Sequence, residues 1–286
     1  MKRCRITAVS VALALGVAAA PALAGTPGPS VSLGKSKGIE YFKGTYQGVV
    51  SQTNQPVMCD NSGGGEVEVT GGGGSITGPA ETSTLFESQP VPQEAWQVEG
   101  ASTAGAQKMT GYAICGPVDL VYVINQTPIG TNTNTFATAV CPDPIGGGGG
   151  ATSPGLRLNM SRPQLPPSTA GWATHMVNST GSDSLFDYYG ICGTYDVKFR
   201  QASKKVDDGE TGSVTAACKE KETLLGGGFA GIKDGVIGYQ LDLLGTKPVD
   251  SKDDEKKVPD DGWRVKAASM AGFNNVELTA IASCRQ

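Results

Sequence analysis

Short stretches in which apolar and polar residues alternate recur along the whole chain. They include Glu66–Thr70, Leu156–Met160 and Tyr239–Leu243, and clusters of Gly, Pro, Asn or Asp separate them every eight to twelve residues. Alternation with a period of two is typical of a β-strand with one buried face, whereas no stretch shows the 3.6-residue apolar period of an amphipathic helix. The pattern therefore predicts an all-β protein.

The first 24 residues have the pattern of a secretory signal peptide. Three basic residues precede an apolar stretch from Ile6 to Ala20, and a small-x-small cleavage pattern ends at Ala24. The apolar stretch is too short to span a membrane, which takes about 20 apolar residues with flanks, and no later stretch approaches that length. We expect cleavage near Ala24, a linker over 25–32, and secretion without membrane insertion.

Six cysteines and three tryptophans follow one repeating order along the exported part of the chain. The spacing from Cys115 to Cys141 is 26 positions, and so is that from Cys192 to Cys218. A tryptophan precedes the last cysteine of each longer interval by 19, 20 or 21 positions, and a glycine run follows the first cysteine. Such self-similarity indicates a repeat protein. The three predicted units are residues 33–115, 116–192 and 193–286.

An even number of cysteines in an exported chain indicates disulfides. Two pairings fit the spacing. One closes each unit on itself, and the other joins cysteines across the 26-residue intervals and ties the two ends of the repeat together. We favour the first because each unit then carries its own pair. The favoured pairs are Cys59–Cys115, Cys141–Cys192 and Cys218–Cys284.

The three glycine runs lie beside predicted strands, at residues 71–74, 146–150 and 226–228. A glycine run in this position usually marks a bulge or a close approach of backbones, and three equivalent runs suggest a position near a pseudo-three-fold axis. The alternative is an anion-binding nest of backbone N–H groups. No helix start or Gly-Lys-Ser/Thr follows the runs, so we favour the structural role.

The order of these motifs resembles a repeat of exported bacterial proteins, notably of actinobacteria. The motifs are Cys, Gly-Gly-Gly, Ser-x-Pro, Gly-Trp and Tyr-Ala-Ile-Cys, and they cover nearly all of the mature chain. The third copy departs from them at Ile281, where the others have Tyr, and in an insertion at 250–261. The resemblance implies an extracellular β-repeat protein and transfers no catalytic residue. In outline, three-fold all-β architecture is also similar to β-prism and β-trefoil lectins, which is an analogy of architecture alone.

Composition and charge narrow the range of partners. Charged residues make up 17% of the chain and hydrophobic residues 38%, so the chain has material for a core. Loss of the signal removes three of the 23 Lys and Arg and none of the 27 Asp and Glu, which leaves a net charge of 20 − 27 = −7. This charge repels phosphate and anionic lipid, so we expect no nucleic-acid partner.

Two interpretations fit the tryptophans Trp96, Trp172 and Trp263. They could be three equivalent platforms on which sugar rings stack, with avidity from several weak sites. The other interpretation is that each fills the core of its unit, because a chain with 6% aromatic residues is expected to bury its largest side chains. We favour the core.

Catalytic chemistry has few candidates in this sequence. His175 is the single histidine, and the corresponding places in the other units hold Glu99 and Lys266, which favours a solvent-facing strand residue over a general base. Oxidised cysteines offer neither a thiolate nucleophile nor soft metal ligands. We therefore predict no enzyme, no cofactor and no metal.

Acidic residues keep two further possibilities open. A glycosidase needs two acids about 5–9 Å apart, and the candidates are Asp119, Asp196, Asp242 and Glu99. The acids of the insertion at 250–261 could bind Ca²⁺, but the insertion lacks the spacing of an EF-hand loop, and we favour a solvated hairpin tip.

The sequence thus predicts a non-catalytic exported protein that binds an extracellular glycan or a surface protein. The first alternative is a structural, envelope-associated protein, for which we expect buried tryptophans and no concave polar pocket. The second alternative is a polysaccharide hydrolase, for which we expect two facing acids in one cleft.

Overall fold

Strands make up most of the described chain, as the alternating pattern predicts. The computed structural model describes residues 29–49, 53–59, 67–80, 82–91, 94–117, 120–151, 155–165, 168–234, 236–237, 241–250, 258–270, 272 and 275–286. Within these ranges there are twenty strands and no helix, hence no helix that could cross a membrane. The all-β prediction is confirmed. The predicted signal peptide, residues 1–24, lies outside the described residues.

Sheet I has seven antiparallel strands in the order β1-β2-β7-β4-β18-β19-β15. Strand β1 includes Val31 and Ser32, the last two residues of the predicted linker, because they pair with β2. These two residues therefore belong to sheet I, whereas residues 25–28 of the predicted linker lie outside the described residues. The bounds are β1 Val31–Ser36, β2 Ile39–Val49, β7 Gln107–Pro117, β4 Val67–Ile76, β18 Leu241–Val249, β19 Gly262–Ser269 and β15 Thr211–Ala217.

Sheet II has six antiparallel strands in the order β3-β6-β5-β10-β13-β8. Sheet III has the order β14-β20-β16-β11-β12-β9, with the short strand β17 paired to β16. The bounds in sheet II are β3 Thr53–Met58, β6 Ala95–Ser102, β5 Ser83–Val91, β10 Pro144–Ala151, β13 Ser184–Cys192 and β8 Val121–Ile129. Those in sheet III are β14 Val197–Val206, β20 Val276–Arg285, β16 Thr223–Lys233, β11 Leu156–Gln164, β12 Gly171–Asn178, β9 Asn134–Val140 and β17 Val236–Ile237.

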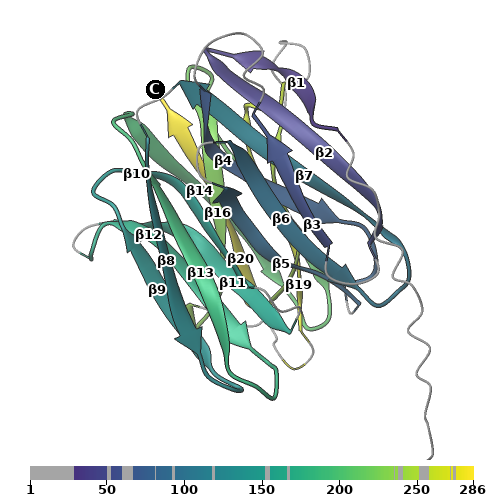
Figure 1. Cartoon of the computed structure of the whole chain (residues 1–286). Coiled ribbons are helices and arrows are strands. Elements are labelled where there is room, and N and C mark those ends of the chain that lie inside the picture. The colour runs from purple at the N-terminus through teal and green to yellow at the C-terminus, as the bar shows by residue number, and fades with distance from the viewer. Residues whose placement is uncertain are drawn as a thin grey trace, which may run out of the picture.

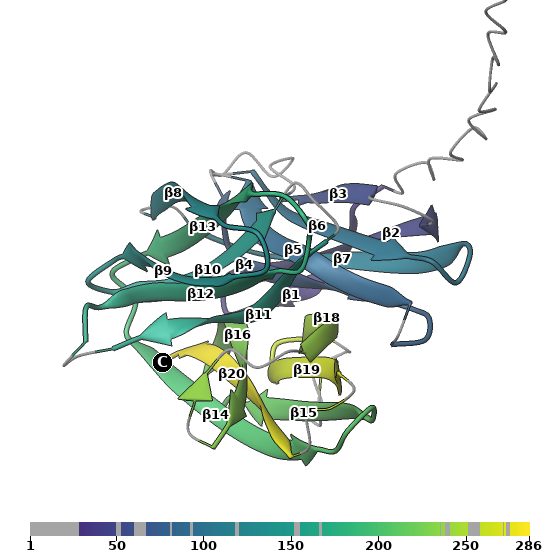
Figure 2. The same ribbon diagram turned by 90° about the horizontal axis from the view of Figure 1, so that it is seen from below.

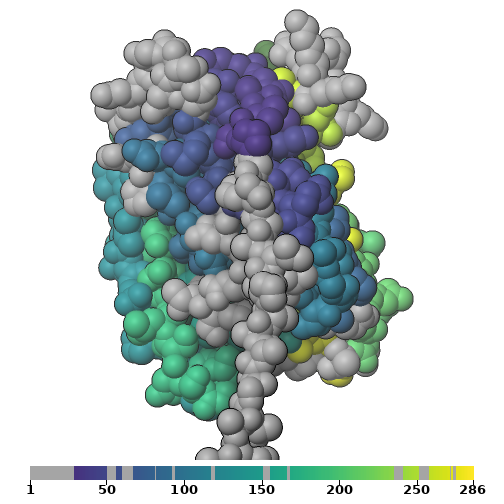
Figure 3. All heavy atoms as spheres, turned by 45° about the vertical axis from the view of Figure 1, so that its right-hand side comes forward, coloured from purple at the N-terminus to yellow at the C-terminus, as the bar shows by residue number. Residues whose placement is uncertain are grey.

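Each sheet is shared between two of the predicted units. Sheet I joins β2, β7 and β4 to β18, β19 and β15, from opposite ends of the chain, and sheets II and III each join strands of the middle unit to one of the others. Figure 2 shows the strands β14, β15, β16, β18, β19 and β20 together below those of the first two predicted units, and Figure 1 gives the view from the side. The space-filling view shows purple, teal and yellow-green segments packed directly against each other (Figure 3). A unit therefore buries its apolar faces only together with its neighbours.

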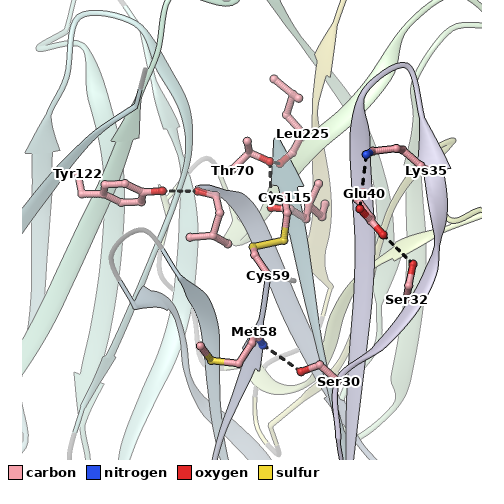
Figure 4. Close-up of a disulfide and its surroundings, with 12 residues drawn as sticks. Ser30, Ser32, Lys35, Glu40, Met58, Cys59, Thr70, Cys115, Tyr122 and Leu225 are labelled. Atoms are coloured by element: carbon pink, nitrogen blue, oxygen red, sulfur yellow. Dashed lines mark hydrogen bonds and ion pairs between the residues drawn. A yellow bond between two sulfur atoms is a disulfide. The ribbon is translucent and has the colours of Figure 1, made fainter. Parts of the chain in front are cut away.

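The glycine runs lie in β4, β10 and β16, where backbones of different sheets meet. A Cβ on Gly71 would lie 2.6 Å from the Cα of Gly226, and one on Gly146 would lie 2.4 Å from the carbonyl oxygen of Thr70. The Thr70 hydroxyl donates to the carbonyl of Leu225 at 2.8 Å and so ties β4 to β16 (Figure 4). Only glycine fits such close approaches, so the runs have the predicted structural role.

The disulfides close each predicted unit on itself, so the favoured pairing is confirmed. The Cα atoms of the three pairs are 5.9, 5.8 and 5.7 Å apart, within the range typical of disulfides. Closing loops of this length stabilises the fold by about 4 kcal/mol per bridge in the loop-entropy model. The pairs are Cys59–Cys115, shown in Figure 4, Cys141–Cys192 and Cys218–Cys284.

Candidate functional site

All three tryptophans are buried, with exposed fractions of 1%, 0% and 0% for Trp96, Trp172 and Trp263. Each indole lies directly over a glycine of a neighbouring sheet. A Cβ on Gly72, Gly147 or Gly227 would be 2.3, 2.4 or 2.2 Å from the Cγ of the respective tryptophan. The core interpretation is confirmed. The sugar-platform hypothesis is wrong for this conformation, because a buried ring offers no face to a ligand.

The indole N–H groups are not equally satisfied. Trp96 Nε1 donates to Ser88 Oγ at 3.0 Å, and Trp172 Nε1 donates to Ser161 Oγ at 2.8 Å. Thr246 stands at the same register relative to Trp263, yet neither its hydroxyl nor that indole N–H has a partner among the described residues. An unpaired buried donor costs about 1–3 kcal/mol, so the third tryptophan has the poorest polar environment.

This difference predicts unequal costs of replacing tryptophan by phenylalanine. Trp172→Phe removes a buried hydrogen bond and leaves the Ser161 hydroxyl without its partner, whereas Trp263→Phe removes a donor that is already unpaired. We expect Trp172→Phe to lower the free energy of unfolding by about 1–2 kcal/mol more than Trp263→Phe. Urea titration of both variants measures the two losses in free energy of unfolding. Equal losses would contradict the prediction.

The prediction that the Glu99, His175 and Lys266 positions face solvent is wrong for two of the three. Glu99 and His175 are 6% exposed, whereas Lys266 is exposed. His175 lies on β12 between Phe136 and Met160 of the adjacent strands, and these two large side chains are its cross-strand neighbours. Lys266 instead lies between Gly245 and Ser213, which leave it open. The size of the cross-strand neighbours therefore decides the exposure.

The environment of His175 does not favour a general base. Its Nε2 lies 3.3 Å from Asn134 Oδ1, and burial lowers the pKa of the imidazole below its usual 6.5. Its Nδ1 has no partner among the described residues. The imidazole is therefore neutral at pH 7. Its hydrogen-bond partner among the described residues is the Asn134 amide, which is not a nucleophile.

The three predicted acid candidates that the structure describes are not brought together. Asp119 lies outside the described residues, as does most of the insertion at 250–261. Asp196 forms a surface ion pair with Lys198 at 2.9 Å. Asp242 forms an ion pair with Arg157, with 2.8 Å between Asp242 Oδ1 and a guanidinium nitrogen. Glu99 alone faces another acid, and this acid is Glu87, which the sequence did not single out.

Glu87 and Glu99 lie directly opposite each other on β5 and β6. Gln89 Nε2 donates to Glu87 Oε1 at 3.0 Å, and Gln97 donates to the same oxygen. Burial, the charge of Glu99 and that of Asp187 raise the pKa of Glu87 to about 8, although the Gln97 hydrogen bond opposes the rise. Glu87 is therefore protonated at neutral pH. With exposed fractions of 3% and 6%, the pair is not open to a polymeric substrate.

Three residues with metal-ligand atoms also lie close together. The ligand atoms of Cys218, Glu222 and Cys284 are within 4.8 Å of one another. The two sulfurs are bonded to each other, and the Glu222 carboxylate accepts hydrogen bonds from Arg200 and from the Lys219 N–H. The hydrogen bond from Arg200 contributes most to lowering the pKa of Glu222. All three groups are thus engaged in structural contacts.

Sheet I carries a basic surface, which consists of Lys43, Tyr112, Lys247, Arg264 and Lys266. Register explains how it forms: Lys43 opposes Tyr112 on β7, and Lys247 opposes Arg264 on β19. The Lys247 ammonium lies 5.8 Å from the centre of the Tyr112 ring, which connects the two pairs across the sheet. Side chains directly opposite in an antiparallel pair share a face, so strands from both ends of the chain build one cationic surface.

A pocket of about 420 Å³ opens on this basic surface. Lys247, Arg264 and Lys266 contribute to its lining, together with small or hydroxyl-bearing residues such as Ser75 and Ser213, and no acid lines the pocket among the residues that the structure describes. Burial contributes most to lowering the pKa of Lys247, and the charges of Arg264, Lys266 and Lys43 lower it further. Such a volume is in the range of small-molecule sites. The arrangement suits an anionic group.

Part of this site was visible in the sequence. Lys247 belongs to the third Ser/Thr-x-Pro motif, and Lys266 is the cation at the Glu99/His175 position. Lys43 and Tyr112 carry no such signal, because they reach the surface only through pairing between distant strands. The chain matches no protein-family model, and a search of curated proteins found no similar sequence.

Proposed function

We propose that this chain is a secreted, lectin-like protein of bacterial type whose three units are arranged about a pseudo-three-fold axis. Apart from β1 and β17, each sheet combines three strands from each of two units. Each unit also supplies one disulfide and one tryptophan that covers a glycine of the next sheet. The sheets are open, which favours a β-prism over a trefoil, because trefoil strands close into a barrel.

Export is supported by two independent features. The three disulfides indicate an oxidising, extracellular environment. The N-terminal pattern of basic and apolar residues is typical of a signal peptide with cleavage near Ala24. The secreted protein therefore meets glycans and surface polymers.

The proposed activity is non-catalytic binding of an anionic glycan at the basic surface. The observation that supports it is the convergence of Lys247, Arg264 and Lys266 on one pocket, whose described lining residues include no acid. Sulfate and carboxylate groups of a glycan are complementary to these cations. The hydroxyls of Ser75 and Ser213 and the partly exposed Tyr112 ring offer the polar and apolar contacts that a sugar needs.

Neither alternative accounts for these features as well. A purely structural envelope protein agrees with the buried tryptophans, but it gives no reason for a concave cationic pocket. A hydrolase agrees with the facing pair Glu87 and Glu99, but these carboxyls are almost completely buried.

Binding of a sulfated hexasaccharide of the heparin type tests the proposal, with neutral maltohexaose as the control ligand. We expect Lys247→Ala and Lys266→Ala each to weaken binding about five- to tenfold, and we expect added salt to weaken it further. Lys198→Ala is the matched control, because this exposed lysine lies on sheet III. Titration calorimetry gives the affinities. Absence of binding, or equal affinity of all variants, would refute the proposal.

A further inference from the structure

Strand β9 forms an edge of sheet III that lacks the usual protection of edge strands. Its seven residues include no charged residue, no Pro and no Gly, and it pairs with β12 without a bulge. Strand β14, at the opposite edge, carries four Lys or Arg residues. Open N–H and C=O groups of an edge can pair with another strand, and charges, Pro or bulges normally prevent this. In Figure 1, β9 lies at the left margin of the molecule.

Two large apolar side chains are exposed on this edge strand, and a third follows β11 in the same sheet. Phe136, Val140 and Leu165 have exposed fractions of 50%, 59% and 48%. Leu165 directly follows Gln164. Gln164 lies opposite Gly171 on β12, and Gly171 lies opposite Val140 on β9. Register therefore places Leu165 at the same end of the sheet as Val140, while Phe136 and Val140 are the exposed apolar side chains of the edge strand itself.

The fold does not need apolar residues at these places. Strand β15 is the corresponding edge of sheet I, where Ser213 lies opposite Lys266 and Ala217 lies opposite Gly262. In β9 the same places hold Phe136 and Val140, opposite His175 and Gly171. Sheet I therefore forms with a polar and a small residue at these two places, whereas the corresponding edge strand β3 of sheet II has an exposed apolar residue, Met58, opposite Ala95.

We infer that β9 pairs with β9 of a second copy of this chain, antiparallel about a two-fold axis at Ala137. An antiparallel edge is complementary to itself, and the absence of charge on β9 means that no like charges meet in the pair. Phe136 then lies opposite Thr138 of the second copy, and Val140 lies opposite Asn134 of the second copy. The neighbouring His175 adds no charge at pH 7, since burial lowers its pKa.

The contact is small, so the dimer is weak and reversible. A strand of seven residues is about 24 Å long at about 3.4 Å per residue, and its pairing covers less surface than the roughly 800 Å² per partner of a standard interface. The basic surface lies on sheet I and takes no part in the contact. The inference therefore does not rest on the proposed glycan binding.

Sedimentation equilibrium of the disulfide-intact mature protein, from about 5 to 500 µM, tests the inference. We expect the mean mass of the wild type to rise toward that of a dimer, and Phe136→Lys and Val140→Lys to stay monomeric with unchanged thermal midpoints. Ile124→Lys is the matched control, because Ile124 is 49% exposed on β8. It should dimerise like the wild type.

A cross-link tests the register separately. In the proposed dimer Ala137 faces Ala137 of the second copy, at a separation that a disulfide can bridge. Ala137→Cys should therefore form a covalent dimer in air, whereas Thr211→Cys, at the edge of β15, should not. A wild type that stays monomeric at the highest concentration overturns the inference. So does a dimer that survives Phe136→Lys or that Ile124→Lys abolishes.

Discussion

Replacement of Trp172 by alanine is expected to lower the free energy of unfolding by about 3–5 kcal/mol, the cost of emptying a large buried aromatic site. The indole is fully buried over Gly147, and its N–H donates to Ser161 Oγ at 2.8 Å. The change therefore removes apolar contact between sheets II and III and leaves a buried hydroxyl without its partner. Urea unfolding of the oxidised protein, followed by far-UV circular dichroism, gives the loss.

The matched control for this prediction is Phe136→Ala. Phe136 is also an aromatic residue of sheet III, but it is 50% exposed, so its removal at low protein concentration should cost less than about 1 kcal/mol. A loss near zero for Trp172→Ala would show that the indole does not hold the two sheets together. It would also restore the hypothesis that this residue serves a ligand.

The elements that the sequence predicts well are those that depend on local pattern or on few alternatives. Strand alternation at Leu156–Met160 predicts β11, and the spacing of six cysteines leaves two regular pairings, of which the structure has the favoured one. Each tryptophan precedes its cysteine by 19 to 21 positions, and a large residue repeated in this way is expected in the core. These predictions need no knowledge of how distant strands pair.

The exposure of single polar residues could not be predicted in the same way. Phe86 is the extra residue of a bulge in β5, and this shift decides that Glu87 comes to lie opposite Glu99. The exposure of His175 depends on Phe136 and Met160 in the strands on either side. Such contacts join residues from distant parts of the chain. The alternation of apolar and polar residues predicts that a segment forms a strand, but it does not predict which strands lie beside it.

The same limit applies to the candidate site. Strands β7 and β18 approach each other only because sheet I joins the two ends of the chain. This brings Lys247 to Tyr112, although the two residues are far apart in sequence. A net negative charge therefore coexists with a local cationic surface, and net charge alone does not predict the sign of the ligand.

Alkaline pH is expected to destabilise this protein through Glu87. Burial and the charges of Glu99 and Asp187 raise its pKa from 4.5 to about 8, while the unfolded chain keeps the ordinary value. The folded state therefore binds the proton more tightly, so this contribution to stability is complete below about pH 4.5 and is lost as the pH rises through 8. Linkage gives a loss of about 4 kcal/mol between about pH 5 and 9.

The variant Glu87→Gln isolates this effect, because the amide keeps the shape of the protonated carboxyl and cannot ionise. Urea titrations from about pH 5 to 9 should show the wild type losing about 4 kcal/mol relative to the variant. His175 titrates equally in both proteins and cancels in the difference, and Tyr189, with a pKa raised by burial to about 12, stays protonated throughout.

Glu99→Gln should shift the midpoint of the loss to lower pH, because it removes the nearest negative charge that opposes ionisation of Glu87. A parallel pH profile for wild type and Glu87→Gln would mean that Glu87 is ionised in the folded protein, and that its two amide donors compensate the charge at the junction of β5 and β10.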